Sequence, residues 1–428
     1  MSTTFLICFC AFLILMFLKV PVFVSVLAGT CLYLAMTTSV TGIVVVGKIM
    51  TGMSSLTLLA IPFFIFSGVL MNTAGITRRI MNLCVALTGR MTGSLAQVNV
   101  LLSTLMGGLS GSCLADTAMQ SKLLVPEMER NGYSKEFSSV VTAVSSLITP
   151  LIPPGICMII YGSLASASVG KLFVAGITLG IALMAFMFAV NYVISKKRGY
   201  SSLRTDKITR AELMKALKEA ALPLCLPIFI IGGIRIGIVT ATEAGAACVV
   251  FAIILGVVYK ELTWKSFLHG LVEATLQTAT IMIIIGAVSS FAWVITVEKI
   301  PQTLLNLMLA TISNKYVFLL LVNLFLLIVG MFVEGNAAAV MLLPILVPIA
   351  KAYGIDLIQF GMIWCFNINI GGLTPPLGTI MYVTCGVTGC KIKDFVREAV
   401  PYFGMLLVEL LIITYVPAFS TWLVNLMW

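Results

Sequence analysis

Thr149-Pro150-Leu151-Ile152-Pro153-Pro154-Gly155 interrupts a long apolar run, and Thr374-Pro375-Pro376-Leu377-Gly378 interrupts another in the second half of the chain. Each proline lacks a backbone N–H and clashes with the preceding turn, so a helix must kink or break there. A break in mid-membrane leaves carbonyl groups free to hold a cation and helix N-termini free to face an anion. We therefore predict two broken helices around a binding site. A mere kink in each helix is the alternative.

The runs around these breaks are typical of a membrane protein. Of the 428 residues, 60% are hydrophobic and 10% are charged, whereas about a quarter of the residues in soluble domains are charged. At about 20 residues per span, the chain accommodates about ten crossings. Eleven cysteines are scattered through apolar runs without metal-ligand spacing. We expect them to be reduced, buried thiols.

The net charge of +10 does not indicate nucleic-acid binding, because the basic residues lie in the joints between apolar runs. The longest polar joint, 196–220, is rich in Lys and Arg. Because cytoplasmic loops carry an excess of basic residues, we predict that this segment is a cytoplasmic linker. With an odd number of crossings per half, both termini are then periplasmic. The second half, 221–428, is inverted relative to the first, 1–195.

The two halves show a weak internal repeat at an offset of 218 residues. Four matches fall on glycine, proline or acidic residues: Gly52 with Gly270, Gly68 with Gly286, Pro126 with Pro344, and Asp116 with Glu334. Such two-fold repetition is typical of secondary transporters. We expect five crossings per half, at about 5–18, 21–40, 55–75, 137–165 and 170–195, and at about 221–236, 241–259, 275–297, 357–387 and 400–425.

Two further stretches, about 92–130 and about 315–350, do not fit single crossings. Each is too long, and each is interrupted near its centre by Gly, Ser or an acid. We predict that they are re-entrant helical hairpins, the first entering from the cytoplasm and the second from the periplasm. Non-helical backbone at membrane depth is tolerated only where protein or a water-filled site satisfies it.

The hairpins contain the candidate cation ligands. In the first, residues 107–112 supply small side chains and hydroxyl groups, and Asp116 follows Ser112 by one helical turn. The second offers Gly330, Glu334, Gly335 and Asn336. An acid inside a span costs at least ~2.5–3.5 kcal/mol and is functional by default, and Na⁺ prefers oxygen ligands. The alternatives are close helix packing by the small residues and a salt bridge at the rim for Glu334.

Several motifs, in order, resemble the large M subunit of TRAP transporters, the DctM/SiaM family, over essentially the whole chain. They are Leu59-Ala60-Ile61-Pro62-Phe63-Phe64, Ser110-Gly111-Ser112 with Asp116, Pro150-Leu151-Ile152-Pro153-Pro154, Thr242-Glu243-Ala244-Gly245-Ala246 and Thr374-Pro375-Pro376-Leu377-Gly378. Gly155 departs from the pattern, because relatives often have Ser there. A substrate hydroxyl contact is then missing.

The resemblance implies an all-α polytopic membrane protein of the bacterial inner membrane. Its fold is an inverted-repeat, elevator-type transporter with about ten transmembrane helices, two re-entrant hairpins and interfacial arm helices. The implied function is sodium-coupled import of a carboxylate-bearing solute such as sialic acid or a C4-dicarboxylate. This is a secondary transporter and not an enzyme, with Na⁺ as coupling ion and no cofactor. The implied partners are a small membrane Q subunit and a periplasmic binding protein.

We assign the site residues from the motifs and the resemblance together. Sodium binding is assigned to Ser110, Ser112, Asp116, Thr149, Pro150, Gly330, Glu334, Asn336, Thr374 and Gly378. Substrate binding is assigned to Ser112, Pro153, Pro154, Gly155, Pro375 and Pro376. Asp116 and Glu334 are the two acids expected to hold the metal ion. The sequence places no arginine clearly at a hairpin tip, so it does not identify the carboxylate.

Two other functions compete with this interpretation. A passive anion channel also accommodates broken helices and repeats. An intramembrane serine protease is suggested by Gly108-Leu109-Ser110-Gly111, which resembles the nucleophile turn of rhomboid proteases. Such an enzyme needs a histidine to activate the serine, and we expect His269 at the cytoplasmic interface. Glu409, within the last span, is expected to bond a neighbouring helix or to contact a basic residue of the Q subunit.

Overall fold

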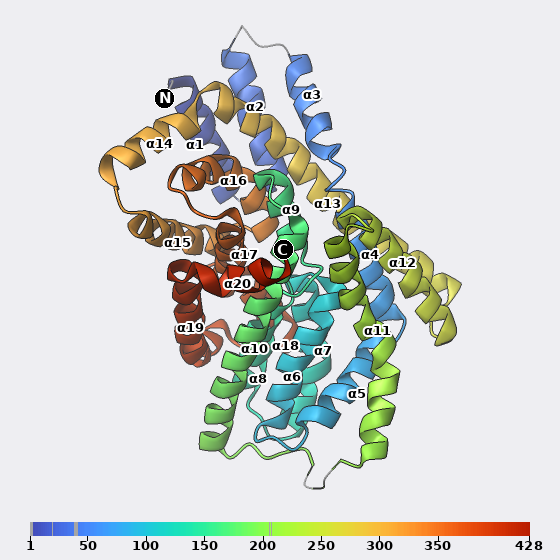
Figure 1. Ribbon diagram of the computed structural model, residues 1–428. Helices are drawn as coiled ribbons and strands as arrows, with labels where there is room; N and C mark the ends of the chain where they lie inside the picture. Colours follow the sequence, from blue (N-terminus) through green and yellow to red (C-terminus); the bar gives the residue numbers. More distant parts are fainter. Residues whose placement is uncertain (1–2, 19, 38–41, 205, 207) are drawn as a thin grey trace.

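The computed structural model of the chain describes residues 3–18, 20–37, 42–204, 206 and 208–428. Within these ranges the molecule consists of α-helices and one short 3-10 helix, without strands (Figure 1). In the same ranges, six helices are long and apolar enough to cross a bilayer, or eight if each of two bent pairs is one span. The all-α, multi-pass architecture is confirmed, whereas about ten crossings stays a prediction.

Both halves of the chain are built of consecutive helices. The first half contains α1 (Thr3–Phe17), α2 (Val22–Met36), α3 (Gly42–Met53), α4 (Ala60–Thr73), α5 (Ile76–Thr88), α6 (Ser94–Ser110), α7 (Cys113–Arg130), α8 (Lys135–Ser145), η1 (Ser146–Ile148), α9 (Ile156–Ala165) and α10 (Val169–Arg198). The second contains α11 (Arg210–Ile236), α12 (Ala241–Val258), α13 (Trp264–Val297), α14 (Ile300–Thr311), α15 (Lys315–Phe332), α16 (Gly335–Ala352), α17 (Leu357–Leu373), α18 (Thr379–Thr388), α19 (Ile392–Tyr415) and α20 (Pro417–Met427). The inverted orientation of the halves stays a prediction.

Each of the two stretches predicted to be a re-entrant hairpin forms two helices separated by a short break, and re-entry stays a prediction. Helix α6 ends at Gly111, whose φ is 59°, and Ser112 caps α7. Helix α15 is followed by Glu334, which caps α16. Asp116 therefore lies one turn into α7, whereas Glu334 precedes α16. The two acids match in the sequence at the 218-residue offset, but they occupy different positions relative to the start of their helices. The side of the membrane from which each hairpin enters stays a prediction.

Both proline stretches are complete breaks, so the mere-kink alternative is wrong. Helix α8 passes into η1, the chain runs without α-helix from Thr149 to Gly155, and α9 begins at Ile156. Helix α17 ends at Leu373 and α18 begins at Thr379. The peptide bonds Pro153–Pro154 and Pro375–Pro376 are both cis.

Several predicted boundaries are corrected. Helix α11 begins at Arg210, behind a capping box of Thr209 and Glu212, so the second part of the 196–220 segment is helical. The chain bends by 71° between α4 and α5 and by 62° between α19 and α20, where Pro417 starts the new helix. Residues 38–40 of the second predicted crossing, and Thr205 and Lys207 of the linker, lie outside the described residues.

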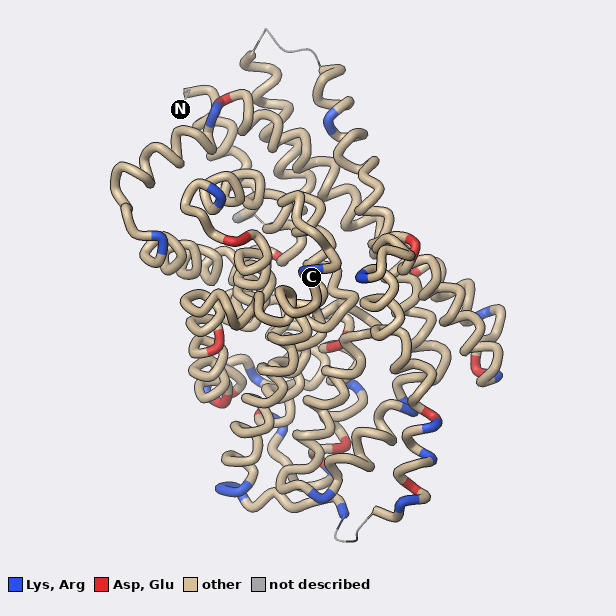
Figure 2. Tube along the Cα trace, viewed as in Figure 1, with Lys and Arg blue, Asp and Glu red and all other residues tan. Residues whose placement is uncertain are grey.

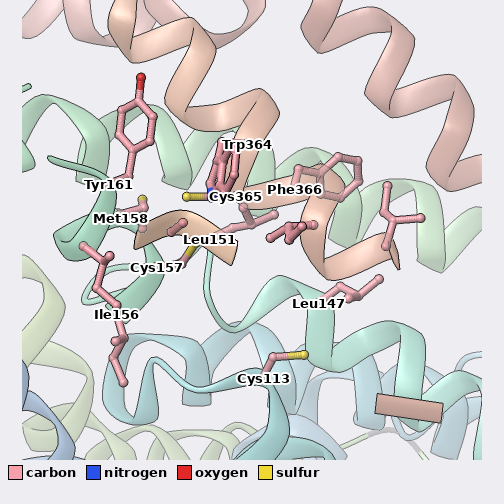
Figure 3. Close-up of a cluster of buried hydrophobic side chains, with 14 of the residues drawn as sticks. Cys113, Leu147, Leu151, Ile156, Cys157, Met158, Tyr161, Trp364, Cys365 and Phe366 are labelled. Carbon is pink, nitrogen blue, oxygen red and sulfur yellow. The ribbon is translucent and has the colours of Figure 1, made fainter. Parts of the chain in front are cut away.

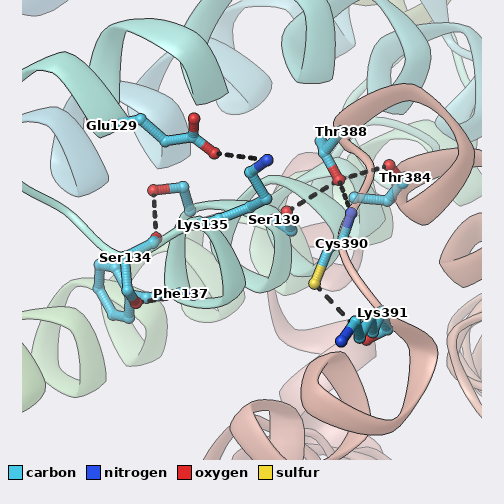
Figure 4. A network of polar contacts seen from close by, with 10 residues as sticks. Glu129, Ser134, Lys135, Phe137, Ser139, Thr384, Thr388, Cys390 and Lys391 are labelled. Atoms are coloured by element: carbon cyan, nitrogen blue, oxygen red, sulfur yellow. Dashed lines mark hydrogen bonds and ion pairs between the residues drawn. The ribbon is translucent and has the colours of Figure 1, made fainter.

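The two halves exchange contacts around the breaks. Helix α7 of the first hairpin packs against α18, and α16 of the second packs against α9. Further along, Ser139 of α8 donates a hydrogen bond to Thr388 of α18 at 3.1 Å (Figure 4). Helix α17 lies buried in the centre, and Figure 3 shows its Trp364 and Cys365 beside Cys157 of α9. The broken helices thus form one packed unit with both hairpins.

Glycines allow helices of the two halves to approach closely. A Cβ at Gly245 of α12 would lie 3.0 Å from Phe63 Cβ of α4, which explains why two of the family-like motifs meet. A Cβ at Gly68 of α4 would lie 3.0 Å from the Leu109 carbonyl oxygen at the end of α6. One at Gly108 of α6 would lie 2.5 Å from Pro227 Cγ of α11. The first hairpin therefore presents glycine backbone to the Pro227 ring of α11, and its end meets α4 backbone at Gly68.

Charged and apolar surfaces are separated along the molecule. Lys and Arg gather mainly at the end where α10 stops and α11 starts, the lower end of Figure 2. Large apolar side chains are exposed on the helices above it; Ile228, Val250 and Ile254 are 71%, 57% and 52% exposed. Such a surface is stable only in contact with lipid or another membrane protein.

Candidate functional site

A cavity lies where the hairpin ends and the helix breaks meet. Its lining comes from the starts of α7, α9, α16 and α18 and from α17: Gly111, Ser112, Cys113, Leu114, Pro150, Ile156, Cys157, Val333, Glu334, Gly335, Asn336, Ile368, Asn369, Gly372, Thr379 and Ile380. Four helix N-termini therefore converge on one small space. Both halves of the chain contribute residues to the lining, as the broken-helix prediction requires.

The N-termini differ in how their amides are satisfied. Ser112 accepts a bond from the Ala115 N–H at the start of α7, and Glu334 accepts bonds from two first-turn amides of α16. Helices α9 and α18 have glycine, Gly155 and Gly378, at their N-cap positions and so have no side-chain cap. Because free first-turn amides and the helix dipole favour negative charge, these two ends can bind an anion such as a carboxylate.

Asp116 lies one turn behind the lining and is 1% exposed. Its Oδ2 accepts hydrogen bonds from Ser103 Oγ at 3.1 Å, Gln120 Nε2 at 2.8 Å and Thr149 Oγ1 at 2.8 Å. Its Oδ1 is buried and has no hydrogen-bond partner among the described residues. Since a buried carboxylate oxygen needs a donor or a cation, this atom is available to a cation.

Glu334 is the charged side chain in the lining. Its Oε2 accepts from the Asn336 N–H at 3.0 Å and the Ala337 N–H at 3.2 Å, and its Oε1 accepts from Asn336 Nδ2 at 2.8 Å. The acid is held by its own helix start, so the rim salt bridge that we considered is not formed within the described residues. Asn336 keeps its side-chain oxygen for another partner.

The first break supplies further oxygen ligands close to Asp116. Thr149 directs its hydroxyl at the acid, and Pro150 lines the cavity. The amide of Ile156 donates to the Gly111 carbonyl at 3.4 Å, which ties the break to the hairpin turn. Within the described residues, no group of three or more His, Cys, Asp or Glu side chains could hold a metal ion. The donor set consists of hydroxyl, carbonyl and carboxylate oxygens, which suits a hard cation.

The remaining predicted ligands lie outside this lining. Thr374 donates its hydroxyl to the Ile370 carbonyl at 2.8 Å. Gly378 fits closely against the Gly372 and Thr374 carbonyls, while Gly330 lies against Gly371 and allows α15 and α17 to approach. Ser110 has a buried Oγ without a hydrogen-bond partner in the described part of the chain.

The predicted substrate contacts at the double prolines are not in the lining either. Pro153, Pro154 and Gly155 are buried, and Pro375 and Pro376 lie partly or fully at the surface. A Cβ at Gly155 would lie 2.1 Å from the Pro150 carbonyl oxygen. This close approach explains the glycine at the position where the family resemblance suggests serine.

A second cavity runs from the first along α7. The two share Ser112 and Ile156, and the second is also lined by Ser110, by Gly68, Asn72 and Thr73 of α4, and by Glu273 and Gln277 of α13. Its far end contains Lys122, a cation that sequence reasoning missed because it lies two turns beyond Asp116. Ser103 and Gln120 were missed as well. Gln120 lies four residues after Asp116 on the same helix, a spacing that could have indicated it, whereas Ser103 comes from α6 and is brought close by the packing of α6 on α7.

Two other singled-out residues stand apart from the site. His269 is exposed and makes no hydrogen bond to Ser110 in the described structure, so the arrangement that a serine protease needs is not formed. Glu409 is 0% exposed, and neither of its carboxylate oxygens has a hydrogen-bond partner among the described residues. Its side chain is thus not at a surface where another subunit could bind, and the expected bond to a neighbouring helix is not present.

Comparisons with known proteins identify relatives of the whole chain. The sialic acid TRAP transporter large permease protein SiaM of Vibrio cholerae is 40% identical over 408 residues, 95% of each chain. The sialic acid TRAP transporter permease protein SiaT of Haemophilus influenzae is 37% identical over all of this chain and 69% of its own length. The C4-dicarboxylate TRAP transporter large permease protein DctM of Pseudomonas aeruginosa is 36% identical, over 86% of each chain.

A solved structure supports the fold alone. The YdaH transporter of Alcanivorax borkumensis superposes with a TM-score of 0.58 at 12% identity, covering 90% of this chain and 88% of its own. The decisive match is to the family described as "Tripartite ATP-independent periplasmic transporter, DctM component", which covers residues 9–419. The chain therefore belongs to the DctM component family of the tripartite ATP-independent periplasmic (TRAP) transporters.

Proposed function

We propose that this chain is the large membrane subunit of a sodium-coupled transporter that imports a carboxylate-bearing solute by an elevator mechanism. The observation that carries the proposal is the cavity between the two hairpins, where Glu334 in the lining and Asp116 one turn behind it lie near two uncapped helix N-termini. A cation and an organic anion can bind there side by side. Sialic acid and C4-dicarboxylates are the candidate substrates, because they are named for the relatives.

Sodium ions bind beside Asp116 and Glu334 in this proposal. At Asp116 the free Oδ1 is the first ligand, and Ser110, Ser112 and the carbonyl groups around Thr149 and Pro150 complete the shell. Glu334, Asn336 and carbonyl groups near Gly330, Thr374 and Gly378 form the second site. Each ion offsets a buried negative charge, which is the main cost of placing an acid in the membrane.

The substrate carboxylate binds against the N-termini of α9 and α18, next to the bound ions. The ions and the helix dipoles attract the same negative group. Sodium therefore raises the affinity for substrate, and substrate raises the affinity for sodium by the same factor, because coupling between sites is reciprocal.

Alternating access follows if the packed unit of hairpins and broken helices slides along α4, α11 and α13. The contact of Gly68 with the Leu109 carbonyl and that of Gly108 with the Pro227 ring support this division, since at both points a glycine without a side chain lies between the two parts. The second cavity, which reaches Lys122, is then the route by which the solute leaves the site.

The transporter works with partners in the bacterial inner membrane. The family description calls the system tripartite and periplasmic, which supports a small membrane Q subunit and a periplasmic binding protein as the other two components. The chain acts here as a secondary transporter, with Na⁺ as coupling ion and no enzymatic step. In proteoliposomes we expect uphill uptake only when both partners are present, and equal uptake by the chain alone would contradict this assembly.

The test of the sodium sites compares Asp116→Asn and Glu334→Gln with the unchanged complex in proteoliposomes. Removing either negative charge weakens one cation site, so we expect at least tenfold lower uptake at low sodium and a shifted sodium dependence. Lys135→Gln, which breaks an exposed ion pair with Glu129, is the control. Unchanged rates and sodium dependence in both acid variants would make the acids structural.

The same assay separates the competing functions. A passive channel equilibrates the solute without a sodium gradient, whereas a symporter accumulates it. A serine protease loses activity in His269→Ala, whereas sodium-driven uptake by this variant should equal that of the unchanged chain.

A further inference from the structure

A basic pocket lies at the ends of α5, α11 and α12, away from the transport cavity. It is lined by Arg78, Arg79, Asn82, Lys218, Glu219, Leu222 and Tyr259. These helix ends lie toward the end of the molecule where Lys and Arg gather (Figure 2). The pocket therefore lies where lipid headgroups are expected.

Its cations are held at different depths. Arg79 is 16% exposed, bonds Glu261 at 3.1 Å and stacks over the Tyr259 ring at 3.8 Å, so it forms a fixed floor. Arg78 also bonds Glu261, at 2.7 Å, but its side chain is 68% exposed. Lys218 of α11 is exposed. These three cations face two carboxylates, Glu219 in the lining and Glu261 beside it, so the pocket keeps an excess of positive charge.

An apolar groove continues from this pocket along α11 and α12. It is lined by Cys225, Leu226, Phe229, Ala247, Val250, Phe251 and Ile254. Leu222 of the pocket lies on the same face of α11 as Cys225 and Leu226, since residues three and four apart are neighbours on a helix. From Leu222 to Phe229 the groove extends about 10 Å at 1.5 Å per residue. Leu222 and Phe229 are 48% and 50% exposed, so the groove is open at the surface.

We infer that the pocket and groove together bind one anionic phospholipid. The headgroup phosphate lies between Arg78, Lys218 and the Asn82 side chain, and one acyl chain follows the groove between α11 and α12. Basic pockets between membrane helices at the cytoplasmic side are known to recognise anionic headgroups. A soluble anion would use the pocket but not the groove, and a zwitterionic lipid would use the groove with little gain from the pocket.

The site has a structural consequence for the scaffold. Tyr259 Oη of α12 donates to the Glu219 carbonyl of α11 at 3.5 Å, and Arg79 of α5 covers the Tyr259 ring. A lipid phosphate bound over Arg78 and Lys218 would join α5 to α11 at the same point. Anionic lipid therefore holds together the helices against which the first hairpin lies.

The test measures dioleoyl phosphatidylglycerol binding to the chain, purified with its small membrane subunit, by native mass spectrometry. In the double variant Arg78→Gln/Lys218→Gln we expect about fivefold weaker binding per removed charge. The matched control is Lys197→Gln/Lys215→Gln, which removes the same charge from residues outside the lining. A second variant, Ala247→Phe, fills the groove and leaves the cations in place, and we expect it to weaken binding of this lipid too.

Ligand arms separate the alternatives. Inorganic phosphate at a hundredfold excess should not displace the lipid, and dioleoyl phosphatidylethanolamine should bind equally weakly to the unchanged chain and the double variant. The inference is overturned if the double variant binds like its control, or if Ala247→Phe has no effect and phosphate displaces the lipid. It is also overturned if Cys225 cross-links to the small membrane subunit, because a protein helix then fills the groove.

Discussion

At Asp116, three donors converge on one carboxylate oxygen while the other oxygen stays free. Ser103, Gln120 and Thr149 hold Oδ2, and this fixes the direction in which Oδ1 points. Such support is what a precise ion site needs, because a loosely held carboxylate cannot discriminate between ions by ligand distance. Asp116 could be predicted from the sequence because an acid within a membrane span is rare and its burial costs free energy.

Lys122 provides a separate test at the residue scale. It lies in the second cavity together with Glu273, on the proposed exit route. Because its ammonium attracts a carboxylate, Lys122→Gln should lower the rate of substrate counterflow from the inside by roughly three- to tenfold. High salt should reduce this difference by screening.

The control for Lys122 is Lys196→Gln, at the end of α10 and outside both cavities. Counterflow is measured in proteoliposomes loaded with labelled solute, at low and high salt. Equal rates for the two variants at low salt would show that Lys122 does not act on the solute.

At the scale of elements, the proline stretches predicted the breaks correctly, because neighbouring prolines remove several helix hydrogen bonds in one turn. Isolated prolines such as Pro126 and Pro344 remain inside continuous helices. The start of α11 at Arg210 was missed because its first turns are charged and read as a loop. Here the capping box of Thr209 and Glu212 was the available signal. The short helices α3 and α14 have no individual signature in the sequence beyond apolar character, so their bounds were not predicted. Helix α5 is amphipathic, with Ile76, Ile80 and Leu83 buried, and this available signal was not used.

The turn of the first hairpin gives an element-scale prediction. Gly111 has φ 59°, and a Cβ there would lie 2.1 Å from the Pro154 carbonyl oxygen. Gly111→Ala should therefore separate the hairpin from the first break and lower uptake at least tenfold. The left-handed conformation alone costs a non-glycine residue about 1–2 kcal/mol.

Gly132→Ala is the matched control for that variant. Gly132 also has a left-handed φ, 83°, but its Cβ would meet nothing within 4 Å. It carries the same backbone cost without the collision, so we expect a small loss of thermal stability and nearly unchanged uptake. Similar loss of uptake in both variants would mean that backbone strain alone is responsible.

At the scale of the whole molecule, the sequence predicted which segments exist but not how the halves meet. The packing of α7 on α18 and of α16 on α9 joins segments far apart in the chain, and no local pattern specifies such pairs. The site residues outside the motifs, such as Asn369 and Thr379, follow from this packing. Asp116 and Glu334 could be predicted because the free-energy cost of burying a carboxylate in the membrane can be read from the single residue, without knowing its neighbours in the fold.

The membrane orientation is the whole-molecule prediction. Helix α3, which contains Lys48, and the end of α10, which the exposed Ser201 follows, lie near opposite ends of the molecule (Figure 1). In a cysteine-free background, Lys48→Cys should react with an impermeant reagent added to intact spheroplasts. Ser201→Cys should react only after the membrane is opened. Labelling of Ser201→Cys from outside would reverse the orientation.

The contact of Gly68 with the end of α6 has a mechanical meaning. Packed helices normally resist sliding because side chains must climb out of the grooves that they fill. A Cβ at Gly68 would lie 3.0 Å from the Leu109 carbonyl oxygen, so backbone of α4 packs directly on backbone of α6. No side chain at this contact has to leave a groove when the two helices slide past each other. An added methyl group would be a steric obstacle to this sliding. We therefore expect Gly68→Ala to slow turnover several-fold, while substrate affinity, measured by equilibrium binding, stays unchanged. If Gly68→Ala turns over as fast as the unchanged chain, steric resistance at this contact does not limit the sliding movement.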